Sequence, residues 1–198
     1  QAAAPAKGAA PAAEDRAHLV LKKTAAPPKI DGVVDLAGGE WKDAVHRQVF
    51  LRNTDATLTE RPRPRVWATF DEKNLYLGFV SPFDKPLKAE TTGRDGPVWR
   101  DDAFEVLLDP RRTRTIFYQF AVNSRGAQYD GCGRDRAWNA DWQYKTAATD
   151  GRWMGEIAIP FAAFGLGEPF DGETWGFNFC RDYTDPTEFV SLAGVASF

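Results

Sequence analysis

The sequence contains little histidine, cysteine or methionine. Its 198 residues include two histidines, two cysteines and one methionine. Zinc sites need His or Cys ligands at close, characteristic spacings, and His18 and His46 stand far from any Cys-x-x-Cys or His-x-x-x-His arrangement. There is no G-x-S-x-G segment, and Cys132 has no neighbouring histidine to activate it. We therefore expect neither a zinc centre nor catalytic residues, and predict that the chain is not itself an enzyme.

An excess of basic charge and long apolar runs are also missing. The chain has 25 Lys and Arg residues against 28 Asp and Glu residues, a formal net charge of −3 that is spread along the sequence. A protein that binds nucleic acid through its phosphates normally shows a basic stripe. A membrane-spanning helix needs about 20 consecutive, mostly apolar residues, and no run approaches that length. We expect no nucleic-acid partner and no membrane span.

The first 17 residues differ in composition from the rest. QAAAPAKGAAPAAEDRA is rich in Ala and Pro, which predicts a disordered segment over residues 1–17 followed by one domain over residues 18–198. A start at Gln1 without methionine is typical of a trimmed precursor and predicts a secreted or periplasmic protein. Cys132 and Cys180 could pair as a disulfide in such a compartment, and the sequence leaves this open.

Short apolar runs with two-residue alternation dominate the rest of the chain. RVWATFD at 65–71 and NLYLGFVSP at 74–82, separated by two residues, predict a β-hairpin. Only two short helical turns are expected, at 40–45 and 161–164. Together the runs predict an all-β fold, an antiparallel β-sandwich. The remaining expected strands are at 18–24, 103–109, 115–123, 151–161 and 174–182.

The stretch VWRDDAFEVLLD at 98–109 carries four carboxylates and a tryptophan. Alternation places Phe104, Val106 and Leu108 on a core face and Glu105 on the opposite face. A glycosidase would need two carboxylates held about 5 to 10 Å apart across a sugar, whereas adjacent aspartates point to opposite faces. Carboxylates in loops could instead hold a structural calcium ion, with turn bonds and ion pairs to arginine as the alternative. The calcium candidates are Asp31, Asp35, Asp101 and Asp102.

Aromatic and amide side chains suggest a binding face. A sugar ring stacks its C–H face on indole and offers hydroxyl groups to amides and carboxylates. One sheet face carrying such residues would form a carbohydrate platform, with core packing as the alternative for Trp138 and Trp142. The candidates are Trp99, Trp138, Trp142, Gln119, Asn123 and Asn178.

Several motifs in order resemble a known family. PKIDGVVD followed by W, FDEKNLYLGF, VWRDDAFEVLLDP, FYQFAVNSRG, RWMGEIAIPF and WGFNFCRD cover roughly residues 27–182. Together they resemble the family 9 carbohydrate-binding modules and their relatives. The resemblance implies a DOMON-like β-sandwich, often with bound calcium, that binds sugars or polysaccharides.

The resemblance also implies a binding site made of two tryptophans that sandwich a terminal sugar, with Glu, Arg, Gln and Asn side chains on its hydroxyl groups. Trp99 matches the first tryptophan and Glu105 the glutamate. The family arginine is replaced by Ala121, with Arg125 just beyond it, and the glutamine by Cys180. The second tryptophan is missing. Phe189, Leu192 and Phe198 stand in its region, and Trp138 is an alternative second ring. The predicted ligand-binding set is Trp99, Glu105, Gln119, Arg125, Asn178 and Trp138.

The resemblance implies a non-catalytic carbohydrate-binding domain of a secreted protein associated with polysaccharide degradation. Such a domain could act with a catalytic domain of the glycoside-hydrolase type, in cis or in trans. Two alternatives stay open. One is a structural or interaction domain of the same fold that has lost sugar binding. The other is a b-type haem electron-transfer domain, for which Met154 would be the only methionine ligand.

Overall fold

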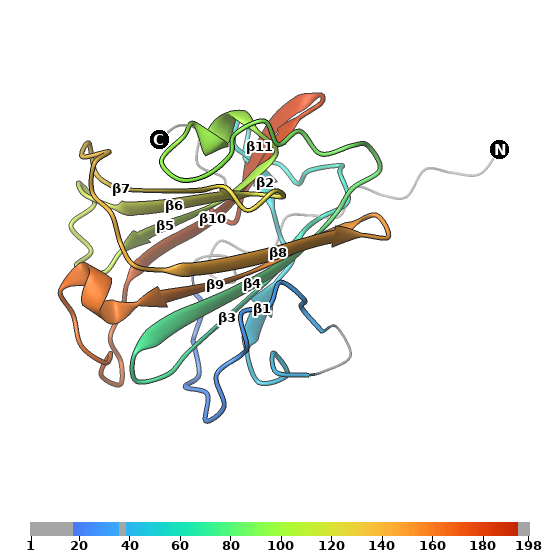
Figure 1. Ribbon diagram of the computed structural model, residues 1–198. Coiled ribbons are helices and arrows are strands. Elements are labelled where there is room, and N and C mark those ends of the chain that lie inside the picture. The colour runs from blue at the N-terminus through green and yellow to red at the C-terminus, as the bar shows by residue number, and fades with distance from the viewer. Residues whose placement is uncertain (1–17, 36–38, 194–198) are drawn as a thin grey trace.

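Two antiparallel β-sheets pack face to face in the computed structural model, which describes residues 18–35 and 39–193 (Figure 1). The five-stranded sheet has the order β1 (Val45–Arg47), β3 (Arg65–Phe70), β4 (Asn74–Pro82), β9 (Arg152–Pro160) and β8 (Gln143–Thr149). The six-stranded sheet has the order β2 (Leu51–Arg52), β11 (Thr187–Ser191), β10 (Gly176–Thr184), β5 (Ala103–Asp109), β6 (Tyr118–Asn123) and β7 (Gln128–Cys132). The predicted antiparallel β-sandwich is confirmed.

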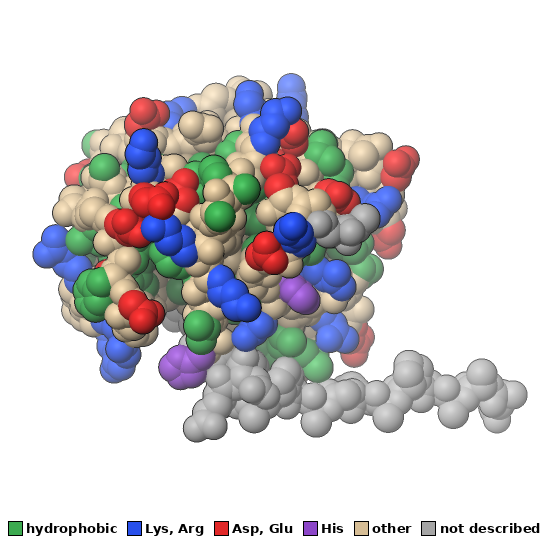
Figure 2. Space-filling model, turned by 90° about the horizontal axis from the view of Figure 1, so that it is seen from below, with side chains coloured by type: hydrophobic (Ala, Val, Ile, Leu, Met, Phe, Trp, Pro, Cys, Tyr) green, Lys and Arg blue, Asp and Glu red, His purple; other side chains and the backbone are tan. Residues whose placement is uncertain are grey.

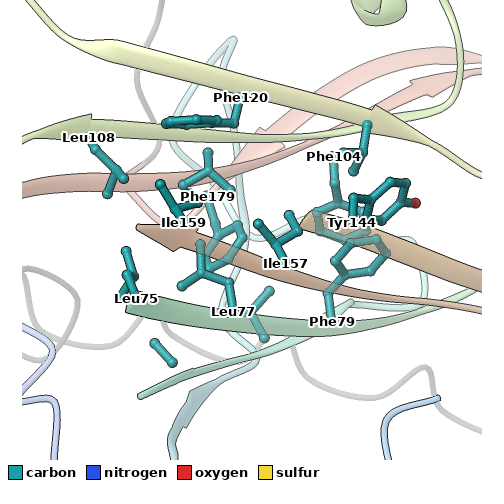
Figure 3. Close-up of a cluster of buried hydrophobic side chains, with 14 of the residues drawn as sticks. Leu75, Leu77, Phe79, Phe104, Leu108, Phe120, Tyr144, Ile157, Ile159 and Phe179 are labelled. Atoms are coloured by element: carbon teal, nitrogen blue, oxygen red, sulfur yellow. The ribbon is translucent and has the colours of Figure 1, made fainter. Parts of the chain in front are cut away.

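The core lies between the two sheets and follows the alternation of the central strands (Figure 3). Phe104, Val106 and Leu108 of β5 are at most 1% exposed, as the sequence predicts. The ring of Phe79 from β4 stacks on that of Phe104 with centroids 3.9 Å apart, and Trp153 from β9 packs edge-on against both. Aromatic contacts therefore join the two sheets across the sandwich.

The strand predictions hold best in the middle of the sheets. The hairpin is confirmed as β3 and β4, and the turn at 161–164 forms the 3₁₀ helix η2 (Phe161–Phe164). Residues 18–24 are not a strand, since only Lys23 makes an isolated bridge, and residues 40–44 form turns without a helix before β1 begins at Val45. The strand predicted at 115–123 begins at Tyr118, and Ile116 is 53% exposed because it belongs to the preceding loop.

Glu156 of β9 holds the N-terminal segment against the outer face of the five-stranded sheet. Its Oε2 accepts hydrogen bonds from the backbone N–H groups of Asp31 and Gly32 at 2.9 and 2.8 Å, and its Oε1 accepts one from Trp41 Nε1 at 2.8 Å. Gly32 is required there, because its φ is 93° and a Cβ atom would lie 2.7 Å from the backbone nitrogen of Thr146. The segment reading IDGVVD followed by W thus has a structural role.

The single methionine of the chain lies on this outer face of the five-stranded sheet, beneath the N-terminal segment. Met154 lies on the same side of β9 as Glu156, as alternation predicts, and packs against the apolar cluster that includes Trp41 and Trp67. The molecule viewed from below carries acidic and basic side chains interspersed, together with histidine (Figure 2). Haem binding stays an untested prediction, and Met154 contributes to packing in this structure.

The two cysteines lie on different strands of the six-stranded sheet. Cys132 is on β7 and Cys180 on β10, with β5 and β6 between them, and both are free thiols. Strands lie about 4.8 Å apart, so three strand spacings exceed the Cα separation that a disulfide allows. The possible pairing is therefore absent.

The prediction of disorder for residues 1–17 and the candidate Phe198 lie outside the described residues. In the described ranges, no helix is long and apolar enough to cross a membrane.

Candidate functional site

A depression of about 410 Å³ opens on the outer face of the six-stranded sheet. The loop between β4 and β5, which contains the 3₁₀ helix η1 (Val98–Arg100), lies over this sheet (Figure 1). Residues from β5, β6, β7, β10 and β11 and from four loops meet in the depression. Its lining consists of Asn53, Trp99, Glu105, Leu107, Phe117, Gln119, Tyr129, Gly133, Arg136, Asp182 and Phe189.

Trp99 forms an aromatic wall of the depression. It is half-buried in η1, and its ring meets that of Tyr129 edge-on with centroids 4.9 Å apart. Beneath it lies a small cluster that includes Val98 and Ala121. Ala121, which stands where the family has arginine, gives the room in which Trp99 packs. Because Trp99 is held by neighbours yet reaches solvent, it can offer a ring to a ligand with little loss of side-chain entropy.

Two buried aspartates hold η1 and the preceding loop in place. Asp101 accepts hydrogen bonds from the backbone N–H groups of Glu90 and Thr91 and from Asn123 Nδ2, at 2.9–3.0 Å. Although burial acts in the opposite direction, these bonds lower the pKa of Asp101. Asp102 accepts from the backbone N–H of Lys88 at 2.8 Å. The two adjacent carboxylates therefore act as loop anchors at the edge of the site.

Glu105 and Gln119 form the polar floor. Gln119 Nε2 donates to Glu105 Oε2 at 2.7 Å across the pair formed by β5 and β6. On either side of Glu105 the sheet register places Ala121 and Cys180, which are small. A carboxylate and an amide beside an aromatic ring give acceptors and donors suited to a hydroxylated ligand.

Asp182 adds a second carboxyl group beside Glu105. It is only 4% exposed, and burial, followed by the negative charge of Glu105, raises the pKa of Asp182 well above its usual value. If Asp182 is ionised, its Oδ2 has no hydrogen-bond partner among the described residues, whereas a protonated Asp182 can donate to Glu105. Burial and the neighbouring carboxylate of Glu105 therefore favour the neutral form of Asp182 on the floor of the depression.

Asp182→Asn is expected to change how stability depends on pH. A raised pKa in the folded state means that the folded protein binds more protons than the unfolded chain, so its stability falls as pH rises from about 4 through the folded pKa. The limiting slope is about 1.4 kcal/mol per pH unit for one proton. Asn stays neutral, so the variant gains stability relative to the parent over that range. Urea unfolding between pH 4 and pH 8 measures the difference.

Asp71→Asn is the matched control, for which the change of stability with pH should have the opposite sign. Against the effect of burial, hydrogen bonds from the backbone N–H groups of Lys73 and Asn74 and from the Tyr76 hydroxyl lower the pKa of Asp71. That variant should lose stability relative to the parent as pH rises through about 4. Equal pH curves for the Asp182 variant and the parent would rule out the raised pKa of Asp182.

Three of the six predicted ligand-binding residues meet in the depression, and three do not. Trp99, Glu105 and Gln119 line it together. Trp138 packs against the rings of Tyr118 and Phe120 on the core side.

The other two residues lie outside the lining. Arg125 donates to the carbonyl oxygen of Ala89 at 3.4 Å, in the turn after β6. Asn178 is buried, with its Oδ1 accepting from the backbone N–H of Ala193 at 3.2 Å. These two side chains therefore satisfy backbone groups next to the sheet.

Sequence reasoning missed several lining residues that come from distant segments. Phe117 shares a face with Gln119 by alternation, which could have identified it. Phe189 of β11 is 45% exposed and lines the depression, in the region where the family has its second tryptophan. No sequence pattern identified Tyr129 or Arg136 as site residues, because their positions depend on how β7 and the loop after it fold back.

The four calcium candidates divide between two places. Asp31 pairs with Lys29 at 3.2 Å in the segment held by Glu156, whereas Asp101 and Asp102 lie at the start of β5, where N–H groups already occupy their oxygens. Among residues 18–35 and 39–193, no group of three or more His, Cys, Asp or Glu side chains is arranged to hold a metal. The four residues do not fit one shared calcium site. Calcium binding elsewhere stays an untested prediction.

Comparisons with known proteins agree with this architecture. Two structures of a family 9 carbohydrate-binding module from Caldicellulosiruptor kristjanssonii are similar to it. The cellotriose complex is 19% identical, with a TM-score of 0.60 over 84% of this chain and 80% of the other. The glucose complex is 18% identical, with a TM-score of 0.62 over 87% and 83%.

A third structure, provisionally assigned as a carbohydrate-binding protein of Bacteroides uniformis ATCC 8492, is 16% identical, with a TM-score of 0.63 over 78% and 79%. At these identities the similarity shows a shared fold. No curated protein matches the sequence significantly. The profile of the family described as "Carbohydrate family 9 binding domain-like" matches residues 30–188. Because that match spans most of the chain, the protein belongs to this family.

Proposed function

We propose that this protein is a non-catalytic carbohydrate-binding domain whose ligand occupies the depression over the six-stranded sheet. The observation that carries the proposal is the meeting of Trp99 with Glu105 and Gln119 in one opening. An indole ring stacks on the C–H face of a sugar, while a carboxylate and an amide bind its hydroxyl groups. Family membership supports the same ligand class.

Phe117 and Phe189 are the rings available to face Trp99 in place of the missing second tryptophan. Both line the depression, from β11 in the case of Phe189 and from the residue before β6 in the case of Phe117. A phenyl ring gives a smaller stacking surface than indole. We expect the site to bind one face of a sugar strongly and the other more weakly.

We further propose that the protein is secreted or periplasmic and is associated with polysaccharide degradation, alone or beside a catalytic domain. The family membership supports this. Because the structural relatives include complexes with cellotriose and glucose, gluco-oligosaccharides are the first ligands to test.

Trp99→Ala is expected to weaken glycan binding at least tenfold. Loss of the stacked indole, with the apolar area that it covers, removes about 1.4 kcal/mol or more, which is tenfold in affinity. Trp99 is only half-buried, which limits the effect on folding. Affinity electrophoresis on soluble polysaccharides, followed by calorimetric titration with the best oligosaccharide, gives the measurement.

Phe170→Ala is the matched control, because Phe170 is 73% exposed and lies outside the depression. Its affinity should equal that of the parent. Equal affinity of the parent and the Trp99 variant would refute this site. If the folded parent binds no glycan in a broad screen, the structural or interaction role is favoured.

A further inference from the structure

Five arginines stand near the depression without an acidic partner. Most other arginines of the described chain have an ion pair or a hydrogen bond, and Arg152 is one of the few exceptions. Carboxylates pair with Arg52, Arg61, Arg94 and Arg181. In contrast, no guanidinium ion pair or hydrogen bond within residues 18–35 and 39–193 involves Arg111, Arg112, Arg114, Arg134 or Arg136. We name these five residues the arginine rim.

The arginine rim comes from two loops that touch. Arg111, Arg112 and Arg114 lie in the loop between β5 and β6, and Arg134 and Arg136 lie in the loop after β7. The backbone N–H of Gly133 donates to the carbonyl oxygen of Phe117 at 2.8 Å, which joins the two loops. Phe117, Gly133 and Arg136 all line the depression. Both loops that carry the rim therefore contribute residues to the proposed sugar site, and Arg136 is the rim residue that lines it.

The acidic residues nearby do not neutralise the rim. Asp109 accepts from the backbone N–H of Arg114 at 2.7 Å, and Asp135 from that of Ala137 at 3.0 Å, so both stabilise turns. Five arginines against Asp109 and Asp135 leave a positive excess on these two loop segments.

Arg136 connects the rim to the aromatic wall. Its guanidinium carbon lies 5.6 Å from the centroid of the Trp99 ring, at the distance of a cation–π contact. A neutral sugar that stacks on this face of Trp99 would displace the Arg136 guanidinium and would offer it no anionic partner. A sugar that carries an anionic group would give the displaced guanidinium a partner, and Arg can bind a carboxylate through two parallel bonds.

We propose that the ligand of this site is an anionic glycan, with one sugar on Trp99 and a carboxylate or sulfate group of the same or the next sugar held by the arginine rim. This inference rests on the proposed carbohydrate-binding function and names the ligand class. Arg136 and Arg134 are the nearest anion partners, and the arginines of the β5–β6 loop attract longer acidic chains.

Matched ligand pairs test the inference on the full chain. Cellotriose is compared with cellotriose oxidised at C6 to the uronate, trigalacturonate with its carboxyl-reduced form, and a sulfated galactan oligosaccharide with its desulfated form. We expect the anionic member of at least one pair to bind about tenfold more tightly, since a charge-assisted hydrogen bond contributes roughly that factor. The carboxylate and sulfate pairs distinguish the two sources of the anion.

Two variants separate a specific site from general attraction between charges. Arg134→Gln with Arg136→Gln should remove the preference for the anionic member, so that the two members of a pair bind with affinities within about twofold of each other. Arg152→Gln is the control, because Arg152 is exposed on the β8–β9 hairpin of the other sheet and has no ion pair in the described chain. It should keep the preference.

The outcomes keep the two proposals apart. If neutral and anionic members bind equally and both need Trp99, the anionic-glycan inference is overturned and the proposed function stands. If neither member of any pair binds and the broad glycan screen is also negative, both fall. Binding of the anionic member that survives Trp99→Ala, or that Arg152→Gln weakens as much as the rim variants do, shows attraction between charges alone and also overturns the inference.

Discussion

Arg181→Met is expected to lower the free energy of unfolding by about 3–5 kcal/mol, the cost of breaking a buried ion pair. Arg181 is 1% exposed between the sheets, and its Nη2 donates to Asp102 Oδ1 at 3.1 Å. Its guanidinium carbon lies 4.2 Å from the ring centroid of Tyr183 and 5.0 Å from that of Trp153. Methionine keeps much of the packing but leaves the carboxylate of Asp102 without its cation.

Urea unfolding, followed by tryptophan fluorescence and far-ultraviolet circular dichroism, measures this loss. Arg52→Met is the control, because the Arg52–Asp55 pair is exposed and such pairs contribute about 1 kcal/mol or less. The double variant Arg181→Met with Asp102→Asn should cost less than the two single changes added together, since neither partner then remains as an unpaired charge. If both methionine variants cost the same, the buried pair does not stabilise the sandwich.

Arg181→Met should also affect the proposed glycan-binding site. Asp102 also accepts from the backbone N–H of Lys88 and from the Thr184 hydroxyl, so it links the core to the loop that carries η1. A charge left unpaired there favours protonation or movement of Asp102. We therefore expect Arg181→Met to weaken glycan binding as well as stability, in a chain whose Trp99 is unchanged.

Glu156→Gln is expected to lower the free energy of unfolding by about 2–4 kcal/mol. The change removes charge-assisted hydrogen bonds and leaves a buried N–H donor without an acceptor. The carboxylate accepts from three N–H groups, two on Oε2 and one on Oε1. A glutamine has one oxygen, so its NH₂ group must face either the indole N–H of Trp41 or the backbone N–H groups of Asp31 and Gly32.

Trp41→Phe is the comparison, because it removes the indole donor and leaves the bonds from Asp31 and Gly32 to Glu156 in place. Trp41 is 2% exposed, so the smaller ring also leaves a cavity, and the local effect at Gly32 distinguishes the two variants. Hydrogen exchange at the Gly32 amide adds a local measurement. Protection there should fall in the Glu156 variant more than protection in the six-stranded sheet. Uniform loss of protection across both sheets would instead indicate a general effect on the core, and unchanged protection at Gly32 would contradict the anchoring role.

The central strands could be predicted because alternation is a local property. The two-residue period over residues 103–109 separated Phe104, Val106 and Leu108 from Glu105 before any strand order was known, and their burial follows it. The edge strands could not be predicted in the same way. β1 and β2 have three and two residues, too few to show a period, and β7 reads QYDGC, which has no apolar alternation.

The binding face was only partly predictable for a related reason. Trp99 and Glu105 lie six positions apart in the sequence, and the motif identifies both. Trp138 follows a turn, where no period indicates which way a side chain points, and it packs into the core. Phe189 and Arg136 reach the depression only because β11 pairs with β10 and the loop after β7 folds back onto Phe117.

The sequence by itself determined the sandwich class, the two faces of the central strands and half of the candidate site, because periodicity and motif order are written along the chain. The tertiary structure decided which distant side chains meet. Strand order brings Asp182 beside Glu105, and loop contacts bring Arg136 over Trp99. Such meetings depend on pairing between residues far apart in sequence, and a local pattern carries no information about them.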